Sequence, residues 1–304
     1  VKDIVAKNVE TKDVSADKDM LDQFKNVHDE SRADANKVVG KVNGKFIERT
    51  DYITGEDKVT TMPTSQLEDN AIIELINEVQ NHFAKSDVSA AAVFNFDSNL
   101  NAGDFKKKDV AFIYKYTNTL MGVNMTGENL LKYMEWSMDY YNQTEPGDVT
   151  ISFNPKVRGY NYDMFDGVNY KVDISKPAGQ RIVDATINGQ PIDPNKTYKV
   201  AVNNYRFGTL MNLGLVTDKD KYYDSYEELQ DGGRIRDLIV RYVQENLKGE
   251  LNPKVDNNWS IIGFEENVPG KDSVIEKIRT GEIKVPMSED GRTLNVQSIN
   301  INNL

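Results

Sequence analysis

Two short clusters of aromatic and amide side chains could together bind a flat ligand. One cluster runs from Tyr114 to Asn118 and the other from Asn203 to Phe207, and each ends a strand-like run. A ring stacked on a heterocycle stabilises the complex by roughly 1–3 kcal/mol per base. An asparagine amide adds a donor and an acceptor for the edge of that heterocycle. The clusters predict a site that sandwiches a heterocycle, although tyrosines at strand ends also commonly pack in a core.

The residues that self-contained hydrolysis would need are scarce in this sequence. The chain has only two histidines, His28 and His82, and no cysteine. A catalytic zinc ion or a metal pair needs several imidazole and carboxylate ligands that converge on one point. The sequence also contains no Gly-x-x-x-x-Gly-Lys-Ser/Thr phosphate loop and no Gly-x-Ser-x-Gly nucleophile elbow. We therefore predict no catalytic residue, no metal ligand and no bound cofactor in this chain.

Composition and charge indicate a globular protein with a polar surface. The chain has 304 residues, of which 38% are hydrophobic and 28% charged. Its net charge of −11 disfavours binding to nucleic acid. No apolar run is long enough for a membrane span, and residues 1–20 do not resemble a signal peptide. The chain begins at Val1, which predicts a piece of a longer precursor, and the lack of cysteine suits a secreted protein.

Periodic apolar residues predict the helices. The longest pattern runs from Lys18 to Val39, with Asp17 as its N-cap and Gly40 as its stop. Such a long, well-solvated helix is a candidate connector between domains. Other helices are predicted after the capping box at 65–68, after Thr126, over 235–247 and over 273–279.

Strand patterns alternate irregularly with these helices. Strands are predicted over 90–96, 119–125, 170–174, 182–187 and 198–202. The dipeptide Asn188-Gly189, between two alternating runs, is typical of a hairpin turn. Because the order lacks a steady βαβ rhythm, we predict an α+β fold: a mixed sheet with packed helices. It would form a single substrate-binding domain preceded by the long connector helix.

Four motifs follow one another through the middle of the chain. They are Val110–Leu120, Met125–Glu135, Gly159–Val168 and Val202–Arg206. The order of these motifs and the residues in them closely resemble the 5′-nucleotidase C-terminal domain family. They are most similar to its 2′,3′-cyclic-nucleotide 2′-phosphodiesterase/3′-nucleotidase branch. The resemblance extends from about Asp17 to about Phe264.

This resemblance implies a division of labour between two domains. In the family, an N-terminal calcineurin-like metallophosphoesterase domain holds a pair of divalent metal ions (Mn, Zn or similar) and performs the hydrolysis. The C-terminal domain, joined through a long helix, binds the nucleoside. The implied boundaries are 1–16 for a remnant of the catalytic domain, 17–40 for the connector helix, 41–264 for the nucleoside-binding domain and 265–304 for a C-terminal extension. The implied location is extracellular, cell-wall-associated or periplasmic.

The resemblance also implies which residues bind the substrate. The base would be clamped between Tyr116 and Tyr205, with Asn118 hydrogen-bonded to its edge. The loop from Arg158 to Asp163 would line the pocket. The full set of predicted substrate-binding residues is Tyr116, Asn118, Arg158, Asn161, Asp163, Asn204, Tyr205 and Arg206. Alternative roles are turn capping for the Asn and Asp residues and surface ion pairs for the arginines.

One departure from the family pattern bears on function. The 5′-nucleotidase branch has a Gly-Gly-Gly-Ile-Arg segment whose Arg helps bind the substrate, and here Phe94–Ser98 contains no Arg. This favours the cyclic phosphodiesterase branch over a 5′-nucleotidase or UDP-sugar hydrolase. Gly232-Gly233-Arg234 is interpreted as a helix-entry turn and not as a phosphate loop.

The predicted partners are nucleosides and nucleotides. Adenine and guanine are favoured because purines offer more ring area than pyrimidines. Since no phosphate-cradling loop is visible, affinity is expected to depend little on the phosphate. If it does depend on phosphate, Arg158 and Arg206 are the first candidates for an anion site. The alternative from another class is a stand-alone nucleoside-binding or surface-interaction protein without catalysis.

Overall fold

The computed structural model describes residues 3–265 and 267–304, which divide into two compact units between Lys37 and Val38. Its α-helices are α1 (Lys18–Gln23), α2 (Lys25–Ala35), α3 (Ala71–Ala84), α4 (Lys107–Ile113), α5 (Gly127–Met138), α6 (Asn204–Asn212), α7 (Ser225–Leu229), α8 (Ile235–Glu245) and α9 (Lys271–Arg279). Its strands are β1 (Val38–Val42), β2 (Val88–Ala91), β3 (Gly103–Lys106), β4 (Leu120–Thr126), β5 (Met164–Asp166), β6 (Asn169–Asp173), β7 (Ile182–Ile187), β8 (Gln190–Pro191), β9 (Thr197–Asn203), β10 (Lys221–Asp224), β11 (Glu250–Leu251) and β12 (Trp259–Ile262). None of the described helices is long and apolar enough to cross a bilayer.

The first unit contains two short helices where one long connector helix was predicted. Asp17 caps α1 as expected, accepting a hydrogen bond from the Met20 N–H at 2.9 Å. The helical run is interrupted at Phe24, whose φ of −97° and ψ of 7° depart from helical values. It ends at Ala35, and the residues from Val38 onward join a sheet.

Gly40 lies inside β1, so its predicted role as a helix stop is wrong. A Cβ added at Gly40 would lie 2.7 Å from the Gly249 carbonyl oxygen. The glycine is therefore needed for the close approach of β1 to the neighbouring chain segment.

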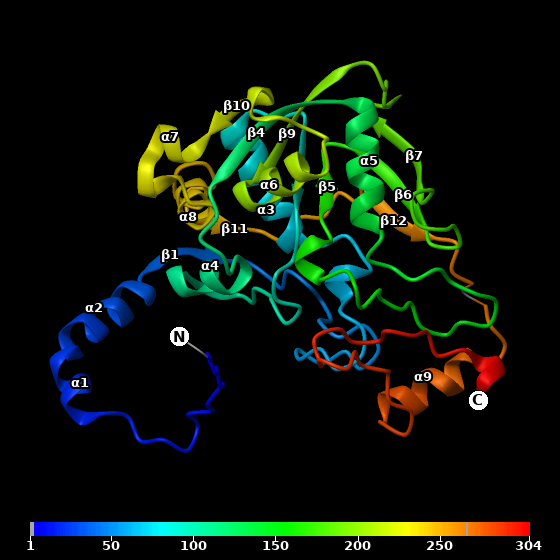
Figure 1. Cartoon of the computed structure of the whole chain (residues 1–304), viewed down its shortest axis with the longest axis horizontal. Helices are drawn as coiled ribbons and strands as arrows, with labels where there is room; N and C mark the ends of the chain where they lie inside the picture. The colour runs from blue at the N-terminus through cyan, green and yellow to red at the C-terminus, as the bar shows by residue number, and fades with distance from the viewer. Residues whose placement is uncertain (1–2, 266) are drawn as a thin grey trace. The chain divides into compact units, whose positions relative to one another are not determined.

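The strands of the described residues form three sheets, which confirms the mixed α+β fold (Figure 1). The central sheet has the order β10-β4-β9-β2-β5, and the others have the orders β11-β1-β3 and β12-β6-β7-β8. Helix α3 packs on β2 and β5 and also against α8, whereas α5 packs on β4 and β7. The completely buried residues Ile72 and Ile76 of α3 and Leu130 and Met134 of α5 place the core along the central sheet.

Several element boundaries differ from the sequence predictions. Helix α3 begins after Asn70, which caps it by accepting from the Ile73 N–H at 3.1 Å, and not at the predicted box over 65–68. Asn188 and Gly189, with φ values of 52° and 73°, do form the predicted turn. The strand after that turn is the short β8, however, and β9 joins the central sheet beside β4. By contrast, Thr126 caps α5 as predicted, accepting from the Asn129 N–H.

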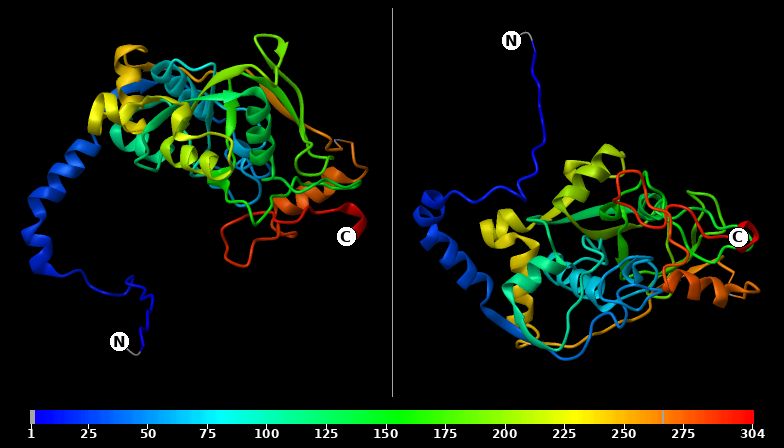
Figure 2. Two further views of the ribbon diagram at one scale, coloured as in Figure 1. Left: turned by 45° about the horizontal axis from the view of Figure 1, so that its top comes forward. Right: turned by 90° about the horizontal axis from the view of Figure 1, so that it is seen from below.

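The residues predicted as a C-terminal extension belong to the second unit. The Val149 N–H donates to the Ile299 carbonyl at 2.7 Å, and the Phe153 N–H donates to the Asn295 carbonyl at 2.9 Å. Figure 2 shows this red C-terminal segment beside the green residues that precede β5. The segment is thus hydrogen-bonded into the domain that carries the central sheet.

Candidate functional site

One edge of the central sheet gathers the aromatic and amide side chains. Strands β2 and β9 are parallel to each other, and β5 and β4 run antiparallel to them. Phe94 and Tyr205 follow the carboxyl ends of β2 and β9, while Asn118 and Tyr160 precede the amino ends of β4 and β5. In a sheet, the carboxyl ends of strands that run one way lie at the same edge as the amino ends of strands that run the opposite way. The strand order therefore brings these four residues together.

Backbone pairing holds the two predicted clusters against each other. In the β4–β9 ladder Leu120 lies opposite Asn203. Beyond that pair, the Asn204 N–H donates to the Thr119 carbonyl at 2.9 Å, and the Thr119 N–H donates to the Asn204 Oδ1 at 3.2 Å. The Asn204 side chain thus fixes the loop before β4 to the start of α6.

The predicted stacking tyrosines line one pocket of about 260 Å³, here called the aromatic pocket. Its lining residues are Phe94, Tyr116, Asn118, Tyr160, Asn203 and Tyr205. The three tyrosines keep much of their surface accessible: Tyr116 is 40% exposed, Tyr160 38% and Tyr205 55%. Exposed aromatic rings at a concave site are the arrangement that stacking on a heterocycle needs.

Each predicted stacking ring is supported by a second ring. The Phe94 and Tyr116 centroids lie 5.0 Å apart with an interplanar angle of 84°. The Tyr160 and Tyr205 centroids lie 6.2 Å apart with an angle of 81°. Edge-to-face contacts of this kind are favourable and restrict ring rotation. Phe94 and Tyr160 therefore orient Tyr116 and Tyr205.

The amides of the pocket are partly committed to the protein. Asn118 donates from Nδ2 to the Tyr114 hydroxyl at 3.5 Å, which leaves its Oδ1 to accept from a ligand. Asn203 caps α6, accepting from the Arg206 N–H at 2.8 Å. Burial raises the pKa of Tyr114, with hydrogen bonds to Asn118 and Asn203 opposing the shift, so this hydroxyl stays neutral.

Arg206 lies behind the pocket, and its side chain is 1% exposed. Its Nε forms an ion pair with Asp163, whose carboxylate also accepts from the Tyr133 hydroxyl at 2.6 Å. Arg206 also donates to the Tyr160 carbonyl at 2.9 Å and to the Asn161 Oδ1 at 3.3 Å. Burial opposes its charge, but the combined attraction of Asp163, Tyr133 and Tyr205 outweighs burial and raises the pKa of Arg206.

Asn161, Asp163 and Arg206, three of the predicted substrate-binding residues, are not among the residues lining the aromatic pocket. These three side chains bind one another because a buried guanidinium requires a carboxylate and further acceptors. Their network fixes the loop that carries Tyr160 to the first turn of α6. Two predicted residues remain. Asn204 is not among the residues lining the aromatic pocket and holds the loop before β4, whereas Arg158 lines an adjacent cavity and pairs with Asp290 at 2.7 Å.

Three lining residues were not named as substrate-binding residues from the sequence, although one of them, Tyr160, lies in the Arg158–Asp163 loop that was expected to line the pocket. Tyr160 was visible inside the Gly159–Val168 motif, and Asn203 stood at the start of the second cluster. Phe94 was assigned to a strand over 90–96, but β2 ends at Ala91 and frees Phe94 to reach the pocket. The local signal for Phe94 and Tyr160 was an aromatic residue just outside a strand.

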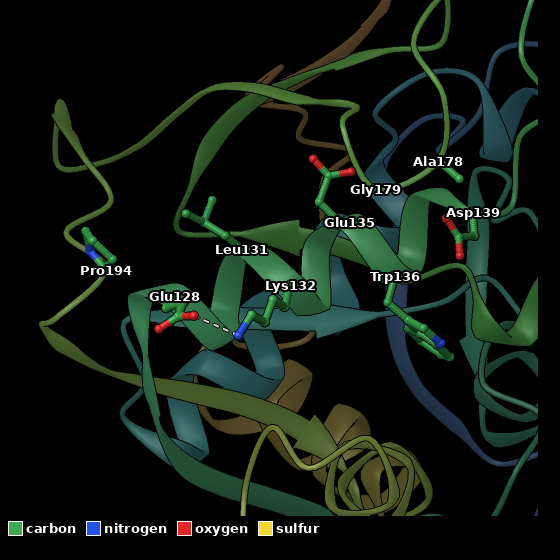
Figure 3. A pocket seen from close by; sticks show the side chains of 9 residues that line it. All are labelled: Glu128, Leu131, Lys132, Glu135, Trp136, Asp139, Ala178, Gly179 and Pro194. Carbon is green, nitrogen blue, oxygen red and sulfur yellow. Dashed lines mark hydrogen bonds and ion pairs between the residues drawn. The ribbon is translucent and has the colours of Figure 1, made fainter.

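A larger cavity of about 570 Å³ lies along α5 and has a different character (Figure 3). Glu128 forms an ion pair with Lys132 at 2.7 Å. The Glu135 carboxylate accepts from the backbone N–H groups of Arg181 and Ile182 at 2.9 and 2.8 Å. Trp136 is the only aromatic residue among those lining this cavity, so no second ring could complete a sandwich.

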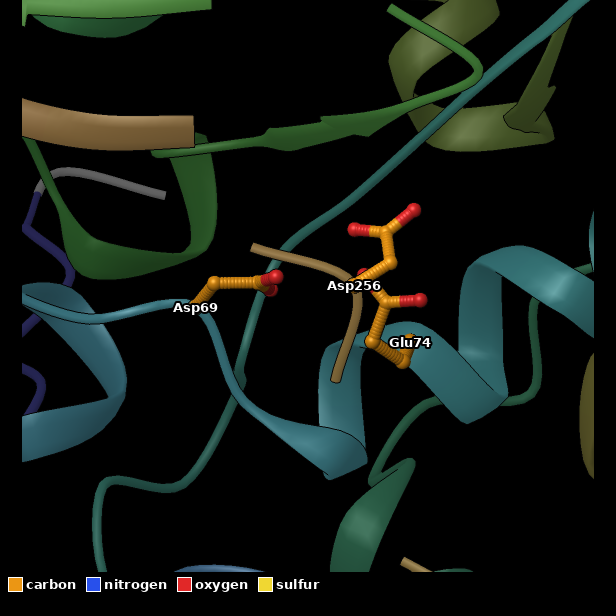
Figure 4. Close-up of side chains that lie close together, drawn as sticks. All are labelled: Asp69, Glu74 and Asp256. Atoms are coloured by element: carbon orange, nitrogen blue, oxygen red, sulfur yellow. The ribbon is translucent and has the colours of Figure 1, made fainter. Parts of the chain in front are cut away.

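Three carboxylates also lie close together at the start of α3 (Figure 4). Asp69, Glu74 and Asp256 each offer an oxygen within 4.8 Å of the others. Burial and the two neighbouring acids raise the pKa of Glu74 to about 9, so a cation would have to displace its proton. Asp69 accepts from the Asn257 N–H at 3.0 Å and so ties the loop before β12 to α3. We assign no metal to this cluster.

The family model described as 5′-nucleotidase, C-terminal domain, matches residues 38–213. Trifunctional nucleotide phosphoesterase protein YfkN of Bacillus subtilis is 31% identical over 232 residues, covering 65% of this chain and 15% of that protein. The 2′,3′-cyclic-nucleotide 2′-phosphodiesterase/3′-nucleotidase of Yersinia enterocolitica is 28% identical over 248 residues, covering 67% of this chain and 36% of that protein. Its counterpart in Haemophilus influenzae is 26% identical over 305 residues, covering 86% and 42%. The chain thus spans less than half the length of these relatives.

Solved structures show the same fold. A putative 5′-nucleotidase from Staphylococcus aureus, solved in complex with alpha-ketoglutarate, superposes with a TM-score of 0.65 at 18% identity, covering 83% of this chain and 45% of that one. The Haemophilus influenzae NAD nucleotidase superposes with a TM-score of 0.55 at 15% identity, covering 81% and 41%.

Proposed function

This chain belongs to the 5′-nucleotidase C-terminal domain family, and on that premise we propose that it is the nucleoside- and nucleotide-binding domain of a metal-dependent phosphoesterase. The observation that carries the proposal is the aromatic pocket at one edge of the central sheet. Tyr116, Tyr205 and Asn118 all line this pocket. The base stacks between the two tyrosines, and the Asn118 amide binds its edge.

The parent protein that fits best is a 2′,3′-cyclic-nucleotide 2′-phosphodiesterase/3′-nucleotidase. Relatives with this printed activity are 26–29% identical to the chain, against 25% for a UshA protein. We propose a bacterial, secreted or periplasmic enzyme of nucleotide catabolism. Its pair of divalent metal ions is held by an N-terminal metallophosphoesterase domain that precedes Val1 in the parent protein. Finding a segment rich in metal ligands upstream of this chain in the full-length gene would support this proposal. The absence of such a segment would favour a binding protein without catalysis.

Division of the substrate between two domains gives this chain a positioning role. The base is held at the aromatic pocket, and the ribose phosphate extends from it toward the metal-bearing domain. Binding energy at the base then fixes the orientation of the phosphate. The reaction between the phosphate and the catalytic groups of the metal-bearing domain thereby becomes effectively unimolecular. The network of Arg206 and Asp163 contributes by holding the loop that carries Tyr160.

Calorimetric titration of the chain with adenosine tests the base clamp. Tyr116→Ala and Tyr205→Ala are each expected to weaken binding by roughly 1–3 kcal/mol, because each removes a stacked ring. Replacement by Phe is expected to cost much less, since the ring face carries the interaction. Tyr226→Ala is the matched control, because Tyr226 is 50% exposed and lies outside the pocket lining. Alanine variants that bind adenosine as tightly as the parent would refute the clamp.

A further inference from the structure

A second cavity of about 380 Å³ adjoins the aromatic pocket. The two hollows share a wall, because Phe94 and Tyr160 line both. The second one, here called the arginine cavity, is also lined by Phe96, Asp97, Arg158 and Arg292. A ligand held in the aromatic pocket therefore needs only to pass Phe94 and Tyr160 to meet two guanidinium groups.

Arg158 has hydrogen-bonding capacity to spare at this cavity. Its Nη2 pairs with Asp290 at 2.7 Å. Its Nη1 is buried and makes no hydrogen bond within the part of the chain that the structure describes. A buried donor without an acceptor is costly. Because Nη1 has almost no exposed surface, a ligand oxygen relieves that cost once the Arg158 side chain turns Nη1 toward the cavity.

Arg292 reaches the same cavity from the C-terminal segment, far beyond the family match over 38–213. It stands on a tight turn: the Ser288 N–H donates to the Thr293 carbonyl at 2.9 Å, and the Ser288 Oγ accepts from the Thr293 N–H at 2.9 Å. The turn holds the Arg292 backbone in place. The Arg292 side chain has no ion pair among the described residues and so is free to bind an anion.

Two carboxylates, Asp97 and Asp290, lie near these arginines and could compete with an anionic ligand for them. Asp97 lines the cavity, but its Oδ1 accepts from the Val59 N–H at 2.7 Å. Asp290 accepts from Arg158, from the Ser288 hydroxyl and from the Arg292 N–H, and these donors hold its pKa well below the usual range. Asp290 thus competes with a ligand for Arg158, whereas Arg292 meets no such competitor among the described residues.

We propose that Arg158 and Arg292 form an anion site that takes the phosphate of a nucleotide whose base occupies the aromatic pocket. The inference rests on the proposed function and adds a phosphate-binding part to it. It revises the expectation that affinity depends little on phosphate. Of the two arginines suspected from the sequence, Arg206 is committed to Asp163, and Arg292 takes its place beside Arg158.

The test is calorimetry with adenosine, adenosine 3′-monophosphate and inorganic phosphate at one ionic strength, since screening alters such contacts. The nucleotide is expected to bind roughly tenfold tighter than adenosine, because one hydrogen bond to a charged group increases affinity by about that factor. Arg292→Gln and Arg158→Gln should abolish this gain and leave adenosine binding unchanged. Asp290→Asn should enlarge the gain, because it removes the carboxylate that competes for Arg158. Arg241→Gln, a surface arginine on α8, is the matched control.

The possible outcomes separate the two proposals. Equal affinity for adenosine and its 3′-monophosphate, or a gain that survives Arg292→Gln, overturns the anion site and leaves the base clamp intact. Loss of the gain in Arg292→Gln together with its increase in Asp290→Asn supports the site. If inorganic phosphate binds through Arg292 while adenosine does not bind, both the nucleotide assignment and the proposed function are overturned.

Discussion

Neighbouring residues at the start of α6 have opposite environments. Tyr205 is 55% exposed at the aromatic pocket, whereas Arg206 is 1% exposed behind it. Successive residues of an α-helix point about 100° apart, so one turn can present a ring to a ligand and bury a charge in the core. Because Arg206 also donates to the Tyr160 carbonyl at 2.9 Å, this single turn positions two of the rings that line the pocket.

Removal of Arg206 is therefore predicted to damage both stability and binding. Arg206→Met leaves Asp163 buried without its cation, which is expected to lower the free energy of unfolding by about 3–5 kcal/mol. Urea unfolding measures this loss. Arg206→Met combined with Asp163→Asn should recover part of it, because the second change removes the unpaired charge. An Arg206→Met protein as stable as the Arg241→Gln control would show that the ion pair is dispensable.

Base selectivity is predicted to be weak. Stacking between two tyrosines accepts any base, and Asn118 offers a free Oδ1 without a second fixed group beside it. Adenosine and guanosine should bind ahead of cytidine and uridine by no more than about tenfold, or roughly 1.4 kcal/mol. Parallel titrations of the four nucleosides measure the order. A pyrimidine preference, or discrimination of a hundredfold, would mean that a hydrogen-bonding group other than Asn118 selects the base.

Among the secondary-structure elements, the amino end of α3 carries an unusual concentration of acid. Burial and the proximity of Asp69, Asp256 and Asp166 raise the pKa of Glu74 to about 9, against a smaller opposing effect of Lys254. Burial and Asp256 raise the pKa of Asp69 to about 6. Both carboxyls therefore bind protons more tightly in the folded chain than in the unfolded one. Their contribution to stability is present at acidic pH and is lost as the pH rises through these values.

Glu74→Gln is predicted to flatten this pH dependence. Glutamine keeps the shape of the protonated acid and cannot ionise, so the variant should lose less stability than the parent between pH 6 and about pH 9. Urea midpoints at pH 5, 7 and 9 give the comparison. Glu128→Gln is the matched control, since Glu128 also stands in the first turn of a helix but is exposed and paired with Lys132. Identical slopes for Glu74→Gln and the parent would contradict the prediction.

Elements with a strong local signal could be predicted from the sequence, and those decided by tertiary contacts could not. The Thr126 cap and the Asn188-Gly189 turn depend on their own hydrogen bonds and dihedral angles, so both were found. The partner of β9 is chosen by a ladder of seven residues with β4, which no local pattern encodes. Phe24 interrupts the predicted connector helix although the apolar spacing continues through it.

In the molecule as a whole, the sequence identified exposed rings of the candidate site better than its charged residues. Tyr116, Tyr205 and Asn118, which motif order and ring chemistry assigned together, line one pocket. Arginine and aspartate side chains serve equally well in a core network or at a ligand, and only burial distinguishes Arg206 from Arg158. Arg292 could not be found, because the fold brings it beside Arg158 from 134 positions away, the difference between the two residue numbers.

The chain by itself is predicted to have no phosphodiesterase activity. Two widely separated histidines cannot supply the ligands of a dinuclear centre, so turnover should need the metal-bearing domain. The assay is hydrolysis of 2′,3′-cyclic AMP by the purified chain with added Mn²⁺ or Zn²⁺. Activity that stays with the chain through successive purification steps and falls in Glu74→Gln would instead place a catalytic metal at the acidic cluster.

The return of the C-terminal segment to the loop before β5 also constrains the order in which the protein can fold during synthesis. Asn295 donates to the Ile151 carbonyl across 144 positions. A ribosome adding 5–20 residues per second needs on the order of ten seconds to make that stretch. Throughout this interval the loop leading to Tyr160 has no partner on that side, and long-range closures of this kind are slow. A nascent chain should thus complete its central sheet first and bring together the two arginines of the proposed anion site, Arg158 and Arg292, last.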